Sequence, residues 1–401
     1  MSVHLQPEHL EKARTLVDEA HARRGLAPLD IPRFWADNER ACRDPFAADC
    51  PQVALGLNMS YECMFAELGV PEDWYRHYHD PAWVRSIAGP YNDKAERIVG
   101  RRLLDERPPD LPELTWPQPR ELHDVFEAEN VFHGDSFWLK QCANTPGGLA
   151  ALLDRVERRL DGGLRAFLLP PEWGREGARL RRLGVPSPIY RSQRGPVTFA
   201  TSIYGAENLI YLILDNPALA ERFRDVLTRA ILERARILDE ERGWRSPADA
   251  GRGWSWADDN SCLLNKEMYD FFAKPVLAAV FTRYAPEPGD LRHQHSDSDM
   301  AQHLETLGEL GLTGANFGPN LTVSQIRRHL PRAVIQGQIA PFTFSRNQEA
   351  NLVAETIRDC EMARPYRGLL LATAGSINNG SRLTGLRLVM AAIQRYGRYA
   401  P

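Results

Sequence analysis

The fold is decided by residues 291–339, which read "LRHQHSDSDMAQHLETLGELGLTGANFGPNLTVSQIRRHLPRAVIQGQI". Short strand-like runs over 290–297, 313–318 and 333–339 alternate here with amphipathic stretches over 298–311 and 322–331, whose apolar residues recur at helical spacing. Each helix returns the chain to the same edge of the sheet, so successive strands run parallel. The stretch therefore predicts part of a parallel α/β sheet covered by helices.

The same alternation continues outward from this stretch. Further strands are expected over 164–171, 197–205, 253–260 and 368–375, with helical patterns between them. With seven or eight strand–helix units, the economical closure is a TIM-like (β/α)8 barrel, and a doubly wound open sheet is the alternative. No glycine-rich phosphate loop follows any strand, which weighs against the nucleotide-binding form of the open sheet.

The amino-terminal part of the chain has a different character. Residues 1–125 are rich in Trp, Pro and charge, and they predict a mostly helical extension followed by a connection. The proline-rich segment 105–124 is the connection, because repeated prolines prevent regular structure. The barrel itself is expected over residues 126–401.

Composition excludes several classes of protein. The 401 residues are 43% hydrophobic with a formal net charge of -4, which suits a large core and no nucleic-acid surface. No apolar run is long enough to cross a membrane, and the amino terminus lacks a secretory signal. The six cysteines are far apart and form no CxxC pair, so reduced thiols and a cytoplasmic location are expected.

Polar side chains gather where the expected strands end. In a barrel of this type the active site forms at those ends, so we expect a small-molecule substrate to contact Asp258, Asp259, Asn316, Gln336 and Asn379. Asp and Asn also cap helices, and capping is the alternative explanation for each of them. Capping accounts less well for adjacent aspartates after a tryptophan-rich strand.

The strand at 290–297 carries the strongest catalytic candidates. Strand alternation places His293, His295 and Asp297 on one face. Imidazole titrates near neutral pH, so we assign His295 as general acid/base, oriented by Asp297, with His293 assisting. His295 and Asp297 could instead be ligands of a divalent metal. The alternative without function is one histidine hydrogen-bonded in the core and the other exposed.

Four segments, taken in order, resemble one known family. They are "RGPVTFATSIYGAENLIYLILDNPALAERFRDVLTRAI" (194–231), "DDNSCLLNKEMYDFFAKPVL" (258–277), "HQHSDSDMAQHLETLGELGLTGANFGP" (293–319) and "LATAGSINNGSRLTGLRLVMAAIQRYG" (371–397). The resemblance is to the uroporphyrinogen decarboxylase superfamily, which also holds zinc- and corrinoid-linked methyltransferases. It implies a TIM-like barrel, in agreement with the alternation of strands and helices.

The sequence also departs from the patterns of that family. The methyltransferase branch holds zinc with a His-x-Cys pair and a later Cys, whereas this chain has His295 and Asp297, and no cysteine in its closing turn 376–379. The decarboxylase branch binds the carboxylates of its porphyrinogen with an arginine-bearing motif near the amino terminus. That motif is not found in "DIPRFWADNERACRDPF" (30–46), nor is a matching aspartate found in "QVALGLNMSYECMF" (52–65). The chain is therefore expected to be a divergent member.

Three functional hypotheses follow. The first is a decarboxylase-like lyase that performs acid–base chemistry on a small acidic molecule other than uroporphyrinogen. The second is a methyltransferase that uses a divalent metal, such as zinc, and works with a corrinoid protein. The third is a non-catalytic binding protein on the same barrel. A homodimer is compatible with the resemblance, and the sequence does not decide it.

Overall fold

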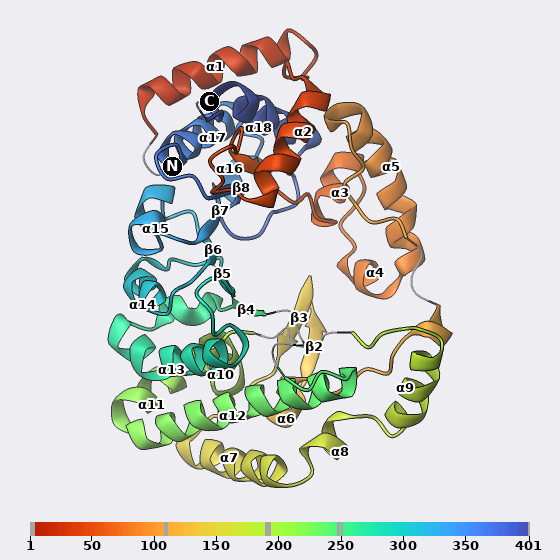
Figure 1. Cartoon of the computed structure of the whole chain (residues 1–401), viewed down its shortest axis with the longest axis vertical. Helices are drawn as coiled ribbons and strands as arrows, with labels where there is room; N and C mark the ends of the chain where they lie inside the picture. The colour runs from red at the N-terminus through yellow and green to blue at the C-terminus, as the bar shows by residue number, and fades with distance from the viewer. Residues whose placement is uncertain (1–4, 108–110, 189–193, 247–248, 250–251, 400–401) are drawn as a thin grey trace. The chain divides into compact units, whose positions relative to one another are not determined.

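The computed structural model describes residues 5–107, 111–188, 194–246, 249 and 252–399, which form two compact units (Figure 1). Unit 1 comprises Met1–Pro108, His295–Leu304 and Leu312–Pro401. Unit 2 comprises Pro109–Gln294 and Glu305–Gly311. This division follows contacts in space, and the separation into an extension over 1–125 and a barrel over 126–401 stays a prediction.

The main sheet has the strand order β1-β8-β7-β6-β5-β4. Its strands are β1 (Ala54–Leu55), β4 (Gly253–Ala257), β5 (Leu291–Ser296), β6 (Gly314–Phe317), β7 (Val334–Ile339) and β8 (Leu369–Thr373). The pairs β6–β7, β7–β8 and β8–β1 are parallel, the last with Ala54 opposite Leu370 and Leu55 opposite Leu371. Pairing of the first strand with the last is the topology of a closing barrel, and the fold is a TIM-like barrel.

All five strands expected between residues 253 and 375 are present. Each begins and ends within a few residues of its predicted bounds. The predicted alternation therefore holds over the second half of the chain, where strands and helices follow one another without interruption.

Two expected strands are helices instead. The run 197–205 belongs to α10 (Pro196–Tyr204), and 164–171 contains α8 (Leu164–Leu168). Proline at the first turn favours the start of α10, and the buried Asp258 carboxylate accepts hydrogen bonds from the first backbone amides of that helix. The α8 sequence "LRAFL" contains no β-branched residue, so its local preference is helical.

The remaining elements are mostly helices. In unit 1 they are α1 (Pro7–His21), α2 (Ile31–Arg43), α3 (Glu62–Leu68), α4 (Trp74–His79), α5 (Pro81–Val99), η3 (Ala301–His303), α15 (Val323–His329), α16 (Pro341–Ser345), α17 (Glu349–Ala363) and α18 (Leu383–Tyr396). In unit 2 the helices are η1 (Pro112–Leu114), α6 (Leu122–Val125), α7 (Pro146–Asp161), α9 (Trp173–Arg182), α11 (Ala206–Asp215), α12 (Pro217–Arg242), η2 (Asp259–Leu263) and α13 (Lys266–Tyr284). Unit 2 also contains the antiparallel hairpin of β2 (Asn130–His133) and β3 (Ser136–Leu139). Helix α14 (Leu304–Glu309) begins in unit 1 and ends in unit 2.

The first helix packs against the last two (Figure 1). Ala13, Leu16 and Val17 of α1 form one buried apolar cluster with Ile357 of α17 and Leu388 of α18. These side chains recur three or four residues apart, which places them on one face of each helix. Helix α1 thus contributes to the core of unit 1.

The described residues contain no single helix that is long and apolar enough to span a membrane. Only α10 and α11 together reach the required length and composition, and they are bent by 101° at the break between them.

Arg327 at the end of α15 connects two strands of unit 1. Its side chain is 5% exposed and donates hydrogen bonds to the backbone carbonyls of Leu330 and Ala333, before β7, and of Arg367 and Gly368, before β8. A buried guanidinium has to be satisfied by acceptors. Here backbone carbonyls supply them to both terminal nitrogens, whereas Nε has no partner among the described residues.

We expect Arg327→Met to lower the free energy of unfolding by about 2–4 kcal/mol, because several buried carbonyls lose their donor. Denaturant unfolding followed by circular dichroism measures the change. The matched control is Arg328→Met, which alters an exposed neighbour on the same helix. Equal stability of the two variants would contradict the assigned role of Arg327.

Candidate functional site

His295 and Asp297 lie at the carboxyl end of β5 in unit 1. The burial of this strand alternates as predicted: Gln294 and Ser296 are fully buried, whereas His293 and His295 are partly exposed. Side chains of a strand point alternately to its two faces, so His295 shares its face with His293. The chain turns directly after Ser296, which places Asp297 at the end of the strand.

Asn316 of β6 fixes the orientation of the His295 ring. The Nδ2 group of Asn316 donates to the carbonyls of Gln336, at 2.5 Å, and of Thr373, at 2.9 Å, so its Oδ1 must be the atom that faces His295. That oxygen lies 2.6 Å from Nδ1 of His295. An amide oxygen only accepts, and therefore Nδ1 of His295 carries a proton.

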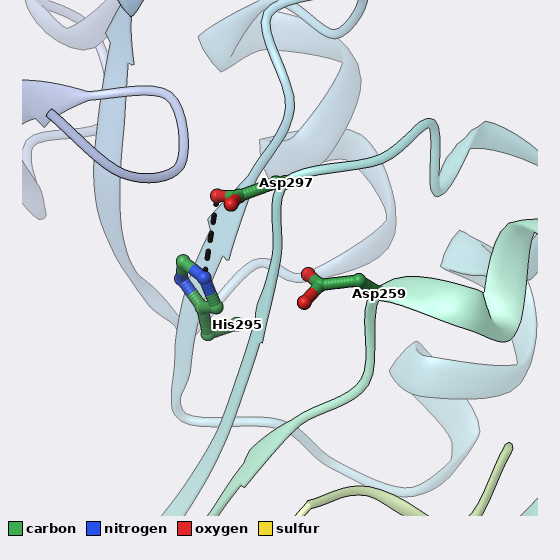
Figure 2. A group of neighbouring side chains, drawn as sticks. All are labelled: Asp259, His295 and Asp297. Atoms are coloured by element: carbon green, nitrogen blue, oxygen red, sulfur yellow. Dashed lines mark ion pairs between the residues drawn. The ribbon is translucent and has the colours of Figure 1, made fainter. Parts of the chain in front are cut away.

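The other ring nitrogen of His295 faces Asp297 (Figure 2). Nε2 lies 3.3 Å from Oδ1 of Asp297. Asp297 also accepts hydrogen bonds from the backbone amide of Ser376, at 2.8 Å, and from its hydroxyl, at 3.2 Å. Burial alone would raise the pKa of Asp297, but the hydrogen bond and charge of His295 and the two Ser376 donors outweigh it and leave this pKa below its usual value.

The turn after β8 approaches Asp297 closely because it contains glycine. Gly375 has a φ of +90°, and a Cβ atom there would lie 2.3 Å from Oδ1 of Asp297. Gly318, after β6, lies against the backbone of Asp297. A Cβ atom at Gly318 would lie 2.6 Å from the carbonyl oxygen of Asp297. The carboxylate therefore sits in a cradle that any larger residue would fill.

This geometry restricts the chemical states of His295. With Nδ1 protonated, a neutral ring would turn the lone pair of Nε2 toward the negative carboxylate of Asp297, which is repulsive. The repulsion is removed if Nε2 is also protonated, which gives an imidazolium paired with Asp297. It is also removed if a cation binds both Nε2 and the Asp297 carboxylate. The pair is thus suited either to donate a proton or to hold a metal.

Two predicted substrate ligands of unit 1 have structural partners. The backbone carbonyl of Gln336 accepts a hydrogen bond from the Asn316 side chain, and the Gln336 side chain is half-buried. Asn379 accepts a hydrogen bond from the backbone amide of Ala66, at 3.0 Å, and donates to Glu72, so it ties the closing turn to α3 and the loop after it. Contact of either side chain with a substrate stays a prediction.

The remaining predicted residues belong to unit 2. Asp258 is fully buried and holds the start of α10, and burial raises its pKa to about 6. Its carboxylate therefore serves the fold, and contact with substrate stays a prediction. His293 lies with Nδ1 2.9 Å from the hydroxyl of Ser255. Asp259, also drawn in Figure 2, opens η2 and is half-buried.

The sequence interpretation missed several residues that shape these surroundings. The sequence predicts Thr373 and Gly375 only as part of a strand and a glycine-rich turn, although a glycine directly after a strand is a signal for a close approach. Arg194 in unit 2 was not singled out. Its guanidinium is half-buried, which lowers its pKa, while the charge of Asp259 acts in the opposite direction.

Comparisons with known proteins agree with this fold. Residues 179–396, more than half of the chain, match the family described as Uroporphyrinogen decarboxylase (URO-D). Among solved structures, a methyltransferase from Methanosarcina mazei matches with a TM-score of 0.54 and 15% sequence identity, over 90% of this chain and 98% of that chain. At this identity the likeness concerns the fold alone. A search of curated proteins finds no match.

We expect Gly375→Ala to destabilise the protein by about 1–3 kcal/mol, since the new methyl group meets Asp297 and the backbone is in a conformation that favours glycine. Denaturant unfolding measures the loss. Gly174→Ala serves as the control, because Gly174 lies in a helix and a Cβ there meets nothing within 4 Å. If Gly375→Ala were as stable as the parent, the cradle around Asp297 would not be tight.

Proposed function

Because the chain belongs to the uroporphyrinogen decarboxylase family, we propose that it is an enzyme with decarboxylase-type lyase activity on a small acidic molecule other than uroporphyrinogen. The observation that supports this most is the relay Asn316–His295–Asp297. It stabilises a doubly protonated ring beside a carboxylate with a depressed pKa. The imidazolium is the form of histidine that acts as a general acid.

In the proposed reaction the bond between the substrate carbon and its carboxylate breaks, and carbon dioxide leaves. The electron pair of that bond stays on the carbon, which then takes the Nε2 proton of His295. Solvent returns a proton to His295 before the next turnover. Asp297 stabilises the imidazolium, and Asn316 keeps Nδ1 protonated so that Nε2 remains the donor. The substrate must itself delocalise the electron pair, as a carbonyl or a conjugated ring does.

The absence of the family's arginine-bearing motif argues for a substrate smaller than a four-ring polycarboxylate. Uroporphyrinogen carries many carboxylates, and each needs a cationic or hydrogen-bonding partner when bound. The segment 30–46 lacks the corresponding pattern. We therefore expect substrates with one or a few carboxyl groups.

A second candidate function is methyl transfer with a bound metal and a corrinoid protein as partner. The donor set favours it, because Nε2 of His295 and the Asp297 carboxylate are metal ligands by type, and the Asn316 bond to Nδ1 orients the ring as outer partners of such histidines do. Without thiolates the set favours a harder ion than the zinc of the methyltransferase branch. Such an ion would supply Lewis acidity that lowers the pKa of a coordinated thiol.

The acid–base proposal is tested by carbon dioxide release from a panel of small carboxylic acids. We expect His295→Gln to reduce the rate at least about a hundredfold, because the proton donor is lost. The control is His329→Gln, an exposed histidine on α15. A variant that kept full turnover would exclude His295 as the acid. Substrate binding with no conversion by the parent protein would instead indicate the non-catalytic alternative.

Metal analysis separates the two candidate functions. Methyl transfer predicts about one tightly bound divalent ion per chain, lost in His295→Ala and in Asp297→Ala. The acid–base proposal predicts that prolonged dialysis against a chelator leaves turnover unchanged. Inductively coupled plasma mass spectrometry before and after dialysis, with turnover measured on the same samples, distinguishes these outcomes.

A further inference from the structure

A cavity lies within unit 1, beside the helices that follow β7. Its volume is about 490 Å³. It is lined by Pro319 and Asn320 after β6, and by residues of β7, α16, α17 and the turns that flank α16. Neither His295 nor Asp297 lines it. Its position after the carboxyl ends of two parallel strands is where ligands commonly bind in this fold class.

The floor of the cavity is a buried, hydrogen-bonded ionic network on α17. Glu355 is fully buried and accepts hydrogen bonds from the backbone amide of Ala340 and the hydroxyl of Thr343, both at 2.8 Å. Arg358, 3% exposed, pairs with Asp359 and donates to the carbonyl of Gln338. Buried charges carry a desolvation cost, and here their bonds fix the loop between β7 and α16 in place.

An exposed arginine without an ion-pair partner among the described residues lies at the mouth of the cavity, whose lining also includes the buried carboxylate of Glu355. The guanidinium of Arg346 lies 5.0 Å from the ring centre of Phe342, which is 61% exposed. Among the residues that the structure describes, Arg346 forms no ion pair, and the amides of Asn320, Gln348 and Asn351 lie around the same cavity. A planar guanidinium binds carboxylate or phosphate through two parallel hydrogen bonds.

The buried side chain of Gln338 also lines the cavity. Gln338 is 1% exposed, and its Nε2 donates to the carbonyls of Gly318 and Leu321. Its Oε1 has no hydrogen-bond partner within the described part of the chain. A buried acceptor without a donor is costly. This oxygen is out of contact with solvent, so a ligand hydroxyl reaches it only if the Gln338 side chain shifts.

We propose that this cavity is a binding site for a small hydroxylated organic anion. The acid group pairs with Arg346 at the mouth, and the hydroxyl groups bond to the amides of Asn320 and Asn351 and approach Gln338. The polar lining excludes a hydrophobic ligand, and the volume accommodates a molecule of a few carbon atoms. The inference does not depend on the proposed function, because it uses none of the residues around His295.

The test is isothermal titration calorimetry of the full chain with glycerol 3-phosphate, which has both an acid group and hydroxyls. Inorganic phosphate and glycerol serve as its separate halves. We expect glycerol 3-phosphate to bind at least tenfold more tightly than either half. Arg346→Ala should weaken its binding at least tenfold, and Asn351→Ala severalfold, since each removes one part of the recognition.

The matched control is Arg328→Ala, an exposed arginine outside the cavity, which should bind like the parent. Melting curves of all variants check that the fold is intact. Failure of the parent to bind glycerol 3-phosphate, or binding that Arg346→Ala leaves unchanged, would overturn the proposal. Inorganic phosphate binding as tightly as glycerol 3-phosphate would overturn the role of the hydroxyl groups. Turnover by the His295 site is measured separately, so failure of one proposal does not decide the other.

Discussion

One amide side chain joins four neighbouring strands of the sheet. Asn316 on β6 donates to the carbonyls of Gln336 on β7 and Thr373 on β8, and it accepts from His295 on β5. With its donors committed to backbone, the side chain has one orientation, and this orientation sets the proton on His295. The chemistry proposed for the site, whether proton donation or metal binding, depends on that single constraint.

Much of the second half of the fold could be predicted from the sequence, because its strands are short apolar runs bounded by clear helix starts. The run 197–205 was mistaken for a strand since it is buried on nearly all sides and shows no periodicity. Its helical form is favoured by Asp258, which lies far along the chain. The strand β1 has two residues, too few to produce a pattern.

The candidate site was predictable to the same extent. Alternation in one strand identified the pairing of His295 with Asp297, and the position of Asn316 at the end of the next strand placed it nearby. The approach of Gly375 and the bonds that orient Asn316 come from backbone atoms of other strands, and no local pattern encodes them. Asp258 and Asn379 show the opposite case. Each is a polar residue after a strand, as the site residues are, but its side chain bonds to neighbouring backbone amides.

The pairing of β1 with β8 has a consequence for biosynthesis. Ala54 and Leu55 leave the ribosome long before residues 369–373, the strand with which they pair, are made. Closing so long a loop carries a large entropic cost, and such contacts form slowly. Until then the backbone groups of Ala54 and Leu55 lack these partners, and an unpaired strand edge of this kind favours aggregation.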